Sequence, residues 1–133
     1  MIIFPKNLPE FDLQCRKAQL LNRLTSLTIT INYPLWNSLW AKDIPSLVSS
    51  SPLECLQLYA ATVIKEGRLD DFVTSLISVH GSRLKRLSLH RLPISLKALD
   101  EVCTGFINLE QLFIAVEQEG LVSSWLRICR ELY

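Results

Sequence analysis

The chain has 133 residues, 49% of them hydrophobic and 20% charged, so it can form one sizeable core but lacks the length for two ordinary domains. Its 14 Lys and Arg residues nearly balance 13 Asp and Glu residues, and the formal net charge of +1 excludes a strong overall attraction to nucleic acid or to an anionic membrane. The N-terminal segment lacks the charged and apolar regions of a signal peptide, and no apolar run approaches membrane-spanning length, so we expect a cytoplasmic or nuclear protein.

Two regions are expected along the chain: a helical flank over residues 1–23, with its helix at 11–21, and a repeat domain over residues 24–133. The repeat is a six-residue phrase, L-x-x-L-x-[LI], and its four copies begin at Leu24, Leu53, Leu84 and Leu109. The intervals between them lie at or close to the period of leucine-rich repeats, about 20 to 29 residues. In each phrase the last two apolar residues point to one side of a short strand, and the first leucine packs beneath its start. Because one repeat cannot bury these side chains alone, neighbouring repeats must stack.

The segments between the strands favour helices. Prolines interrupt residues 33–51, where we expect only a short helix around 44–48. A longer amphipathic helix is expected from the spacing of five apolar residues, namely Leu69, Phe72, Val73, Leu76 and Ile77. Asp70 and Asp71 suit the positive end of its dipole, and Gly81 is expected to end it in the left-handed conformation.

Two further helices are predicted towards the C-terminus. Ser95 is the expected N-cap of the first, which ends near Gly105 and turns five residues inward: Leu96, Leu99, Val102, Cys103 and Phe106. Cys103 is therefore expected in the core. The second covers the fourth repeat with helical spacing at Leu121, Val122, Trp125, Leu126 and Cys129.

Strand followed by helix, repeated in one handed sense, predicts an α/β leucine-rich-repeat solenoid arc with short parallel strands on the concave side and helices on the convex side. The four repeats are irregular, because the asparagine of the usual ladder is present only as Asn32. Leu132 lies where a fifth repeat would begin, so we expect the domain to be truncated at its C-terminus.

Two segments, HGSRLKRLSLHRLPIS from His80 and LEQLFI from Leu109, resemble the repeat region of fungal F-box-like proteins. The resemblance spans roughly residues 20 to 120. It implies that the repeats recruit a substrate, while a separate F-box docks on the adaptor of a cullin-based ubiquitin ligase. No F-box pattern precedes Leu24, so a ligase adaptor is an expected partner only if an F-box lies upstream.

The residues between the core leucines are expected to form a concave binding face for a protein partner. The residues predicted to bind the partner are Thr28, Thr30, Gln57, Tyr59, Arg86, Ser88, His90, Gln111 and Phe113. Ser26, Cys55 and Ala115 are expected on the same face. Parallel strands lie about 4.8 Å apart, so Tyr59 and His90 are expected to be neighbours, with Arg86 and Phe113 close by. The plainer interpretation of these residues is an ordinary solvated sheet face.

The predicted function is therefore protein–protein interaction, in the form of substrate recognition for an F-box-type ubiquitin-ligase receptor. The alternative is a non-functional or purely structural solenoid fragment from a truncated gene model. A third hypothesis, a hydrolase, would depend on His80 or His90. An enzyme is not expected, because the chain has no GxSxG, P-loop or GxGxxG motif.

Metal, cofactor and nucleic-acid sites are not expected either. The four cysteines form no CxxC pair and do not cluster with a histidine, which argues against a metal site or a disulfide framework. The adjacent acidic pairs, Asp70–Asp71 and Asp100–Glu101, point about 100° apart on a helix and cannot share a site. The basic run over residues 83–91 is divided between the concave face and the flanking turns, which argues against a phosphate-binding strip.

Overall fold

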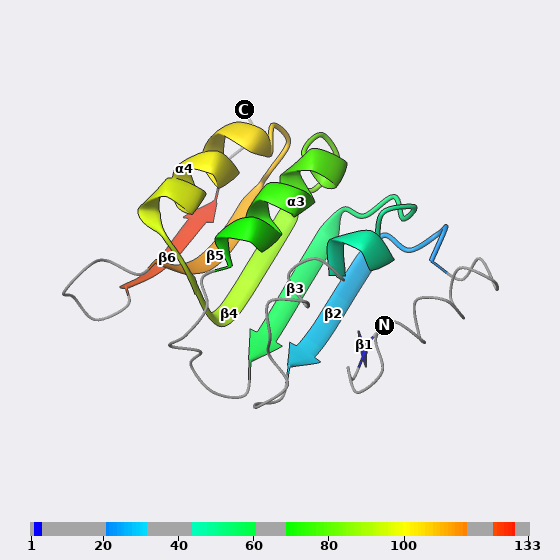
Figure 1. The fold of residues 1–133 in the computed structure, drawn as a ribbon, viewed down its shortest axis with the longest axis horizontal. Coiled ribbons are helices and arrows are strands. Elements are labelled where there is room, and N and C mark those ends of the chain that lie inside the picture. Colours follow the sequence, from blue (N-terminus) through cyan, green and yellow to red (C-terminus); the bar gives the residue numbers. More distant parts are fainter. Residues whose placement is uncertain (1, 4–20, 32–43, 61–68, 117–123, 130–133) are drawn as a thin grey trace.

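The computed structural model describes residues 2–3, 21–31, 44–60, 69–116 and 124–129, and within them it shows a six-stranded sheet with helices on one face (Figure 1). The strands follow one another across the sheet in chain order. They are β1 (Ile2–Ile3), β2 (Ser26–Ile31), β3 (Cys55–Ala60), β4 (Arg86–Ile94), β5 (Gln111–Val116) and β6 (Ser124–Cys129). The first five run parallel, and β6 is antiparallel to β5. The predicted α/β fold with parallel strands is therefore confirmed.

The leucines of the repeated phrase align across the sheet and form its buried side. Leu27, Leu56, Leu87 and Leu112 are register partners in successive strands, as are Ile29, Leu58 and Leu89. All of them are buried. Of the first leucines of the phrases, Leu53 and Leu84 are fully buried, and the other two are partly buried against the same core. The apolar residues of neighbouring strands thus share one core with the residues of the covering helices.

One backbone carbonyl before each strand fixes this register. Thr25 O accepts hydrogen bonds from the N–H groups of both Glu54 and Cys55, at 2.8 and 3.0 Å. Glu54 O accepts from two residues of the next repeat in the same way, and Lys85 O accepts from two residues of the repeat after that. The repeated pattern holds the starts of β3, β4 and β5 level with one another.

Helix α3 (Asp70–His80) covers the buried side of the sheet with the predicted apolar stripe. Phe72, Val73 and Leu76 are fully buried, and Ile77 packs against the same core. Asp70 and Asp71 lie in its first turn, as expected. A short helical segment over residues 44–47 lies on the same side of the sheet (Figure 1).

Helix α4 (Leu96–Gly105) begins and ends where the sequence predicts, and Ser95 is its N-cap, with its Oγ accepting from Ala98 N–H at 3.1 Å. The same residue ties the two helices together, because its N–H and hydroxyl donate to the Asp70 carboxylate at 3.1 and 2.7 Å. A second link between them is the 3.0 Å hydrogen bond from Thr74 Oγ1 to Glu101 Oε2. The starts of α3 and α4 are therefore fixed by side chains as well as by packing.

The predicted inward face of α4 was partly wrong. Val102 and Phe106 are buried, but Leu96 is 54% exposed and Cys103 is exposed, while Ala98 is buried instead. Residues four apart lie on one helix face, whereas Cys103 is rotated about 100° from Val102. Its side chain is consequently exposed, and Cys103 is not a core residue.

Gly81 adopts the right-handed conformation, with φ −55° and ψ −32°, so the expected left-handed stop was wrong. A glycine is needed at this position because the ends of the two helices approach each other closely. A Cβ at this position would lie 2.6 Å from Ile77 O and 2.8 Å from Gly105 O. A Cβ on Gly105 would likewise lie 2.6 Å from Cγ2 of Ile77, so the two glycines let α3 and α4 meet at their C-terminal ends.

Strand β4 contains an irregularity that the periodic pattern did not reveal. Its register with β5 shifts between Ser88 and Pro93, and Arg91 within the shifted part has a positive φ of 61°. Arg91, expected in a flanking turn, therefore lies inside the strand. Because of the shift Ala115 pairs with Pro93, and it is only 2% exposed, so it offers little surface to a partner.

Both ends of the sheet differ from the sequence expectation. The segment Ser124–Cys129, expected within a helix, is a strand that pairs along the whole of β5. Pairing with this segment satisfies the backbone N–H and C=O groups at the edge of β5. Local spacing cannot distinguish a short apolar strand from a helix, so it did not reveal this strand. At the other end Ile2–Ile3 pairs with β2, which the helical flank did not anticipate. Of the predicted helix over 11–21 only Leu21 is described, and it lies in a turn; Leu121 and Val122 also fall outside the described residues.

Gly81→Ala is expected to lower the free energy of unfolding by about 1 to 3 kcal/mol, because a methyl group there meets two backbone oxygens that cannot rotate away. Gly105→Ala should cost less, since the atoms it meets belong to the Ile77 side chain. Urea unfolding of both variants measures this order. A stabilised Gly81→Ala variant, the usual result for a glycine in a right-handed conformation, would contradict the prediction.

Candidate functional site

The candidate site is the sheet face opposite α3 and α4, which we call the far face. Strand alternation sends every second residue of β2 to β5 to this face, as the alternating burial of β3 shows. The parallel register arranges these residues in three rows: Ser26–Cys55–Arg86–Gln111, Thr28–Gln57–Ser88–Phe113 and Thr30–Tyr59–His90. All nine residues predicted to bind a partner lie in these rows, exposed or half-buried.

Three aromatic rings from three neighbouring strands stack on one another across the far face. The ring centroids of Tyr59 and His90 are 4.2 Å apart with an interplanar angle of 11°. Those of His90 and Phe113 are 4.4 Å apart at 27°. The first pair are register partners, so strand spacing alone brings their rings together, as the sequence predicted. We refer to Tyr59, His90 and Phe113 as the aromatic row.

Phe113 joins the aromatic row although its register partner is Ser88 rather than His90. The register shift in β4 begins just after Ser88, so β5 no longer follows β4 residue for residue at this point. His90 is therefore the diagonal neighbour of Phe113 on the same face, within reach of an aromatic side chain. Beside the aromatic row, the hydroxyl of Thr28 donates to Oε1 of Gln57 at 3.3 Å and links β2 to β3.

The aromatic row is uncharged near neutral pH. Burial between the neighbouring rings lowers the pKa of His90 below its ordinary value of 6.5, because a partly desolvated ring disfavours the charged form. The ring is therefore largely neutral at pH 7. Three flat, mutually stacked side chains form one semi-rigid apolar strip on an otherwise polar surface.

The edge of the far face where the strands begin is polar and charged. A hollow of about 180 Å³ there is lined by Thr25, Ser26, Glu54, Cys55, Lys85 and Arg86. Within it Glu54 Oε1 lies 3.4 Å from Lys85 Nζ, and both side chains are about half exposed. Arg86, which lies on the far face itself, is exposed.

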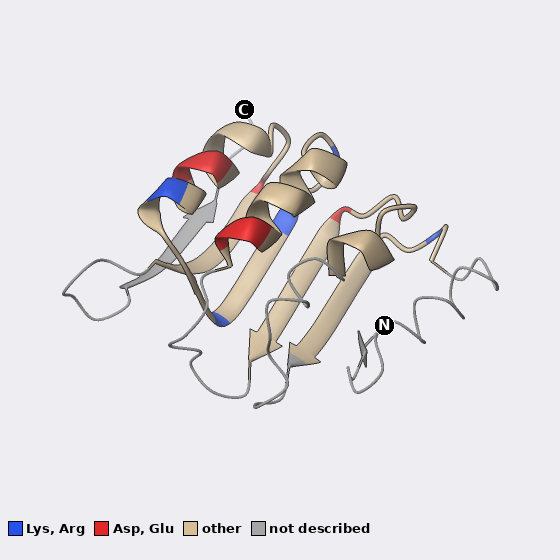
Figure 2. Ribbon diagram, in the orientation of Figure 1, with Lys and Arg blue, Asp and Glu red and all other residues tan. Residues whose placement is uncertain are grey.

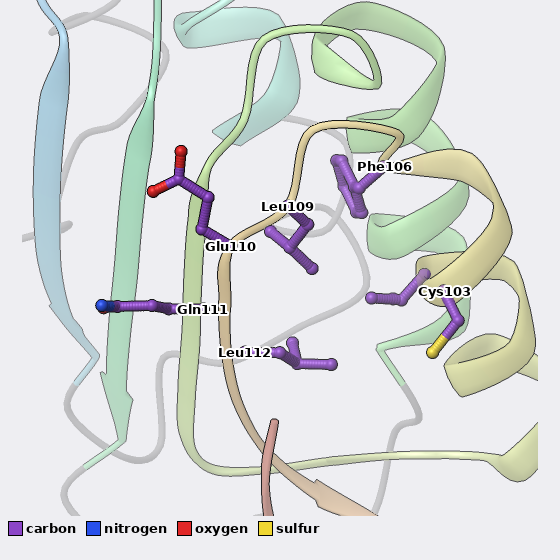
Figure 3. Close-up of a pocket in the computed structure, with 7 residues that line it drawn as sticks. Cys103, Phe106, Leu109, Glu110, Gln111 and Leu112 are labelled. Atoms are coloured by element: carbon purple, nitrogen blue, oxygen red, sulfur yellow. The ribbon is translucent and has the colours of Figure 1, made fainter. Parts of the chain in front are cut away.

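A second hollow, of about 150 Å³, lies on the other side of the sheet beside α4 and was not predicted (Figure 3). Its lining includes Cys103 and Phe106 from the helical segment, and Leu109 and Leu112 from the start of β5. Gln111, between the two leucines, points away to the far face (Figure 3). No local sequence pattern indicates this hollow, because it forms between a helix and a strand that are brought together by the fold.

The two histidines considered for catalysis occupy different environments. His90 lies in the aromatic row, whereas His80 ends α3 inside the core, only 1% exposed. Neither ring nitrogen of His80 has a hydrogen-bond partner among the described residues, and the Oγ of buried Ser51 also lacks one. The structure does not bring the two histidines together on one surface.

His80 is held in the neutral form. Burial lowers its pKa most strongly; the backbone of Val48 acts in the opposite direction without forming a hydrogen bond of ordinary geometry, and the positive charge of Arg83 lowers the pKa further. A buried neutral imidazole without a partner is a destabilising group in the folded state. His80 therefore belongs to the core rather than to the candidate site.

Two of the four cysteines, Cys55 and Cys103, are free thiols. Among the described residues no cluster of three or more His, Cys, Asp or Glu could hold a metal ion. None of the described helices combines the length and apolarity needed to cross a membrane.

Comparisons with known proteins do not assign the chain to a family: no protein-family model, no curated protein and no solved structure matches it. The resemblance to the repeat region of F-box-like proteins therefore stays a prediction.

Acidification is expected to destabilise the fold through His80. Because the folded-state pKa lies below 6.5, the unfolded chain takes up the proton first as the pH falls. The free energy of unfolding therefore begins to decrease as the pH falls through 6.5. The decrease is complete once the pH lies below the folded-state pKa of His80. Urea unfolding midpoints at a series of pH values measure this loss.

The control for this prediction is His80→Leu, which keeps a similar volume and removes the titrating ring. The variant should be at least as stable as the wild type at pH 7 and lose less stability on acidification. His90→Gln, at a half-buried position, should change the pH profile less than His80→Leu. Identical profiles for the wild type and His80→Leu would show that His80 does not titrate differently on folding.

Proposed function

We propose that the chain is a leucine-rich-repeat solenoid module that binds another protein through its far face. Three observations support the repeat assignment: parallel strands in chain order, leucines in register across them, and helices confined to the opposite side. Repeat proteins of this kind use an extended sheet surface as a platform for partners. The observation that carries the proposal is the aromatic row, which spans three neighbouring strands of that surface.

The aromatic row has the properties of a protein-binding anchor. Aromatic residues and arginine dominate the binding energy of many interfaces, and the far face carries both, with Arg86 at its edge. Stacking already restricts the rings of Tyr59 and His90, so less side-chain freedom is lost when a partner binds. Gln57 and Ser88, in the neighbouring row, supply hydrogen-bonding groups beside these rings.

We propose further that the bound protein is a substrate of an F-box-type ubiquitin-ligase receptor in the cytoplasm or the nucleus. Support for this comes from the resemblance of the segments that begin at His80 and Leu109. The free thiols of Cys55 and Cys103 are compatible with a reducing compartment. A ligase adaptor enters this proposal only through an F-box upstream of the described repeats.

The alternative proposal, a purely structural solenoid fragment, is favoured by one observation. Helix α4 leaves Leu96 exposed, and Cys103 exposed at the apolar hollow, where a neighbouring repeat would bury them. Sedimentation and thermal unfolding of the purified chain distinguish the two. A monomer that melts cooperatively supports a binding module, whereas a chain recovered only as aggregate supports the fragment.

Tyr59→Ala and Phe113→Ala are each expected to lower partner capture by on the order of tenfold or more, because each removes one end of the aromatic row. The measurement is quantitative mass spectrometry of proteins retained by the immobilised full chain. Lys97→Ala is the matched control, since this exposed residue lies in α4 on the opposite side of the sheet.

Thermal unfolding of each variant separates lost binding from lost structure. The proposal predicts that both aromatic variants remain folded, since unstacking one ring costs only about 0.5 to 1.5 kcal/mol. If folded Tyr59→Ala and Phe113→Ala retain the same proteins as Lys97→Ala, the far face is not the binding surface.

A further inference from the structure

Acidic residues of the two helices, namely Asp70, Asp71, Asp100 and Glu101, lie on the helix side of the sheet together with Lys97 (Figure 2). Glu54 lies in the hollow at the edge of the far face. The described far-face rows contain no Asp or Glu, and Arg86 carries their only formal charge at neutral pH. His90 adds none, because burial lowers its pKa.

Arg86 is positioned to receive a negative group from a partner. Its backbone N–H donates to Glu54 O at 3.0 Å, which fixes the start of β4, and its side chain is exposed. The neighbouring charges in the hollow, Glu54 and Lys85, lie 3.4 Å apart and offset one another. No ion pair to Arg86 is found among the described residues, so the lining of this hollow carries one uncompensated positive charge.

The distance between Arg86 and the aromatic row limits the partners that can contact both. Arg86 and His90 lie four positions apart on β4, on the same face, and both keep regular register with β3. At a rise of about 3.3 Å per residue the two positions are separated by about 13 Å. A partner in extended conformation spans this distance with two side chains that are also about four residues apart.

We propose that the far face binds an extended acidic peptide segment, with one Asp or Glu on Arg86 and an aromatic or aliphatic side chain, four residues away, on the aromatic row. This inference rests on the proposed binding role of the far face and specifies the chemistry of its partner. An arginine guanidinium binds a carboxylate with two parallel hydrogen bonds, so the contact fixes orientation as well as charge.

The charge of the hollow favours a carboxylate over a phosphate group. A single carboxylate neutralises the one uncompensated positive charge that Arg86 contributes. A phosphate carries about −1.5 to −2 charges at neutral pH and would leave an excess of negative charge beside Glu54.

The inference is tested with a random-peptide display library of about twelve residues per peptide, selected on the immobilised full chain and, in parallel, on Arg86→Glu. Peptides selected by the wild type should be enriched in Asp or Glu, with an aromatic or aliphatic residue four positions away. Arg86→Glu should select Lys or Arg at the acidic position instead, because the charge on the protein is reversed.

The affinity of one selected synthetic peptide is then measured by fluorescence anisotropy. Arg86→Gln should weaken binding about tenfold, and replacing the acidic residue of the peptide by Gln should weaken it equally. Arg83→Gln is the matched control, since Arg83 is an exposed arginine in the turn before β4 and should change affinity by less than about twofold. Binding should weaken as the salt concentration rises.

Three results would overturn the inference, and they differ in what they imply for the proposed function. Selected peptides that depend on Tyr59 and Phe113 but not on Arg86 would leave the binding face intact and remove its acidic specificity. A phosphoserine peptide that binds about tenfold more tightly than the Glu peptide would replace the carboxylate by a phosphate. If no peptide is selected, or if binding ignores Tyr59, Phe113 and Arg86 alike, the inference and the proposed function both fail.

Discussion

The stacking of leucines in register across parallel strands is the constraint on which the other features of this structure depend. Leu27, Leu56 and Leu87 each occupy the same position in successive strands and are fully buried in the core that the strands share with the helices. The paired hydrogen bonds to the carbonyl oxygens of Thr25, Glu54 and Lys85 hold the strands at this level. A slip of one residue would move every leucine to the far face and every polar residue into the core.

The same register creates the far face. Once the leucines are aligned on the helix side, the residues between them must form rows on the other side, about 4.8 Å apart. That spacing is close to the separation of stacked aromatic rings, which explains why Tyr59 and His90 lie 4.2 Å apart. The aromatic row is thus a consequence of repeat alignment at positions where the sequence supplies aromatic residues.

Helix packing meets a different requirement, close approach of two backbones. Gly81 and Gly105 allow the ends of α3 and α4 to meet, while Asp70 and Ser95 join their starts through hydrogen bonds. The helices thereby keep their acidic residues on the side of the sheet away from the far face (Figure 2). Strand register and helix packing together place these acidic residues opposite the far-face rows, which contain no Asp or Glu.

The sequence by itself determined strands β2 to β5, the α/β class and the residues of the far face, because each depends on local spacing of two or about 3.6 residues. It also determined the N-cap at Ser95, which depends on residue type at the start of a helix. Only the tertiary structure decided which helix residues lose contact with water, as the exposure of Cys103 shows, since that depends on where α4 touches its neighbour. It also decided that Ser124–Cys129 is a strand, because the edge of β5 provides backbone partners that local spacing does not record. The tertiary structure likewise decided the role of Gly81 and the hollow beside α4. Both arise from contacts between segments distant in the chain, which no local pattern encodes.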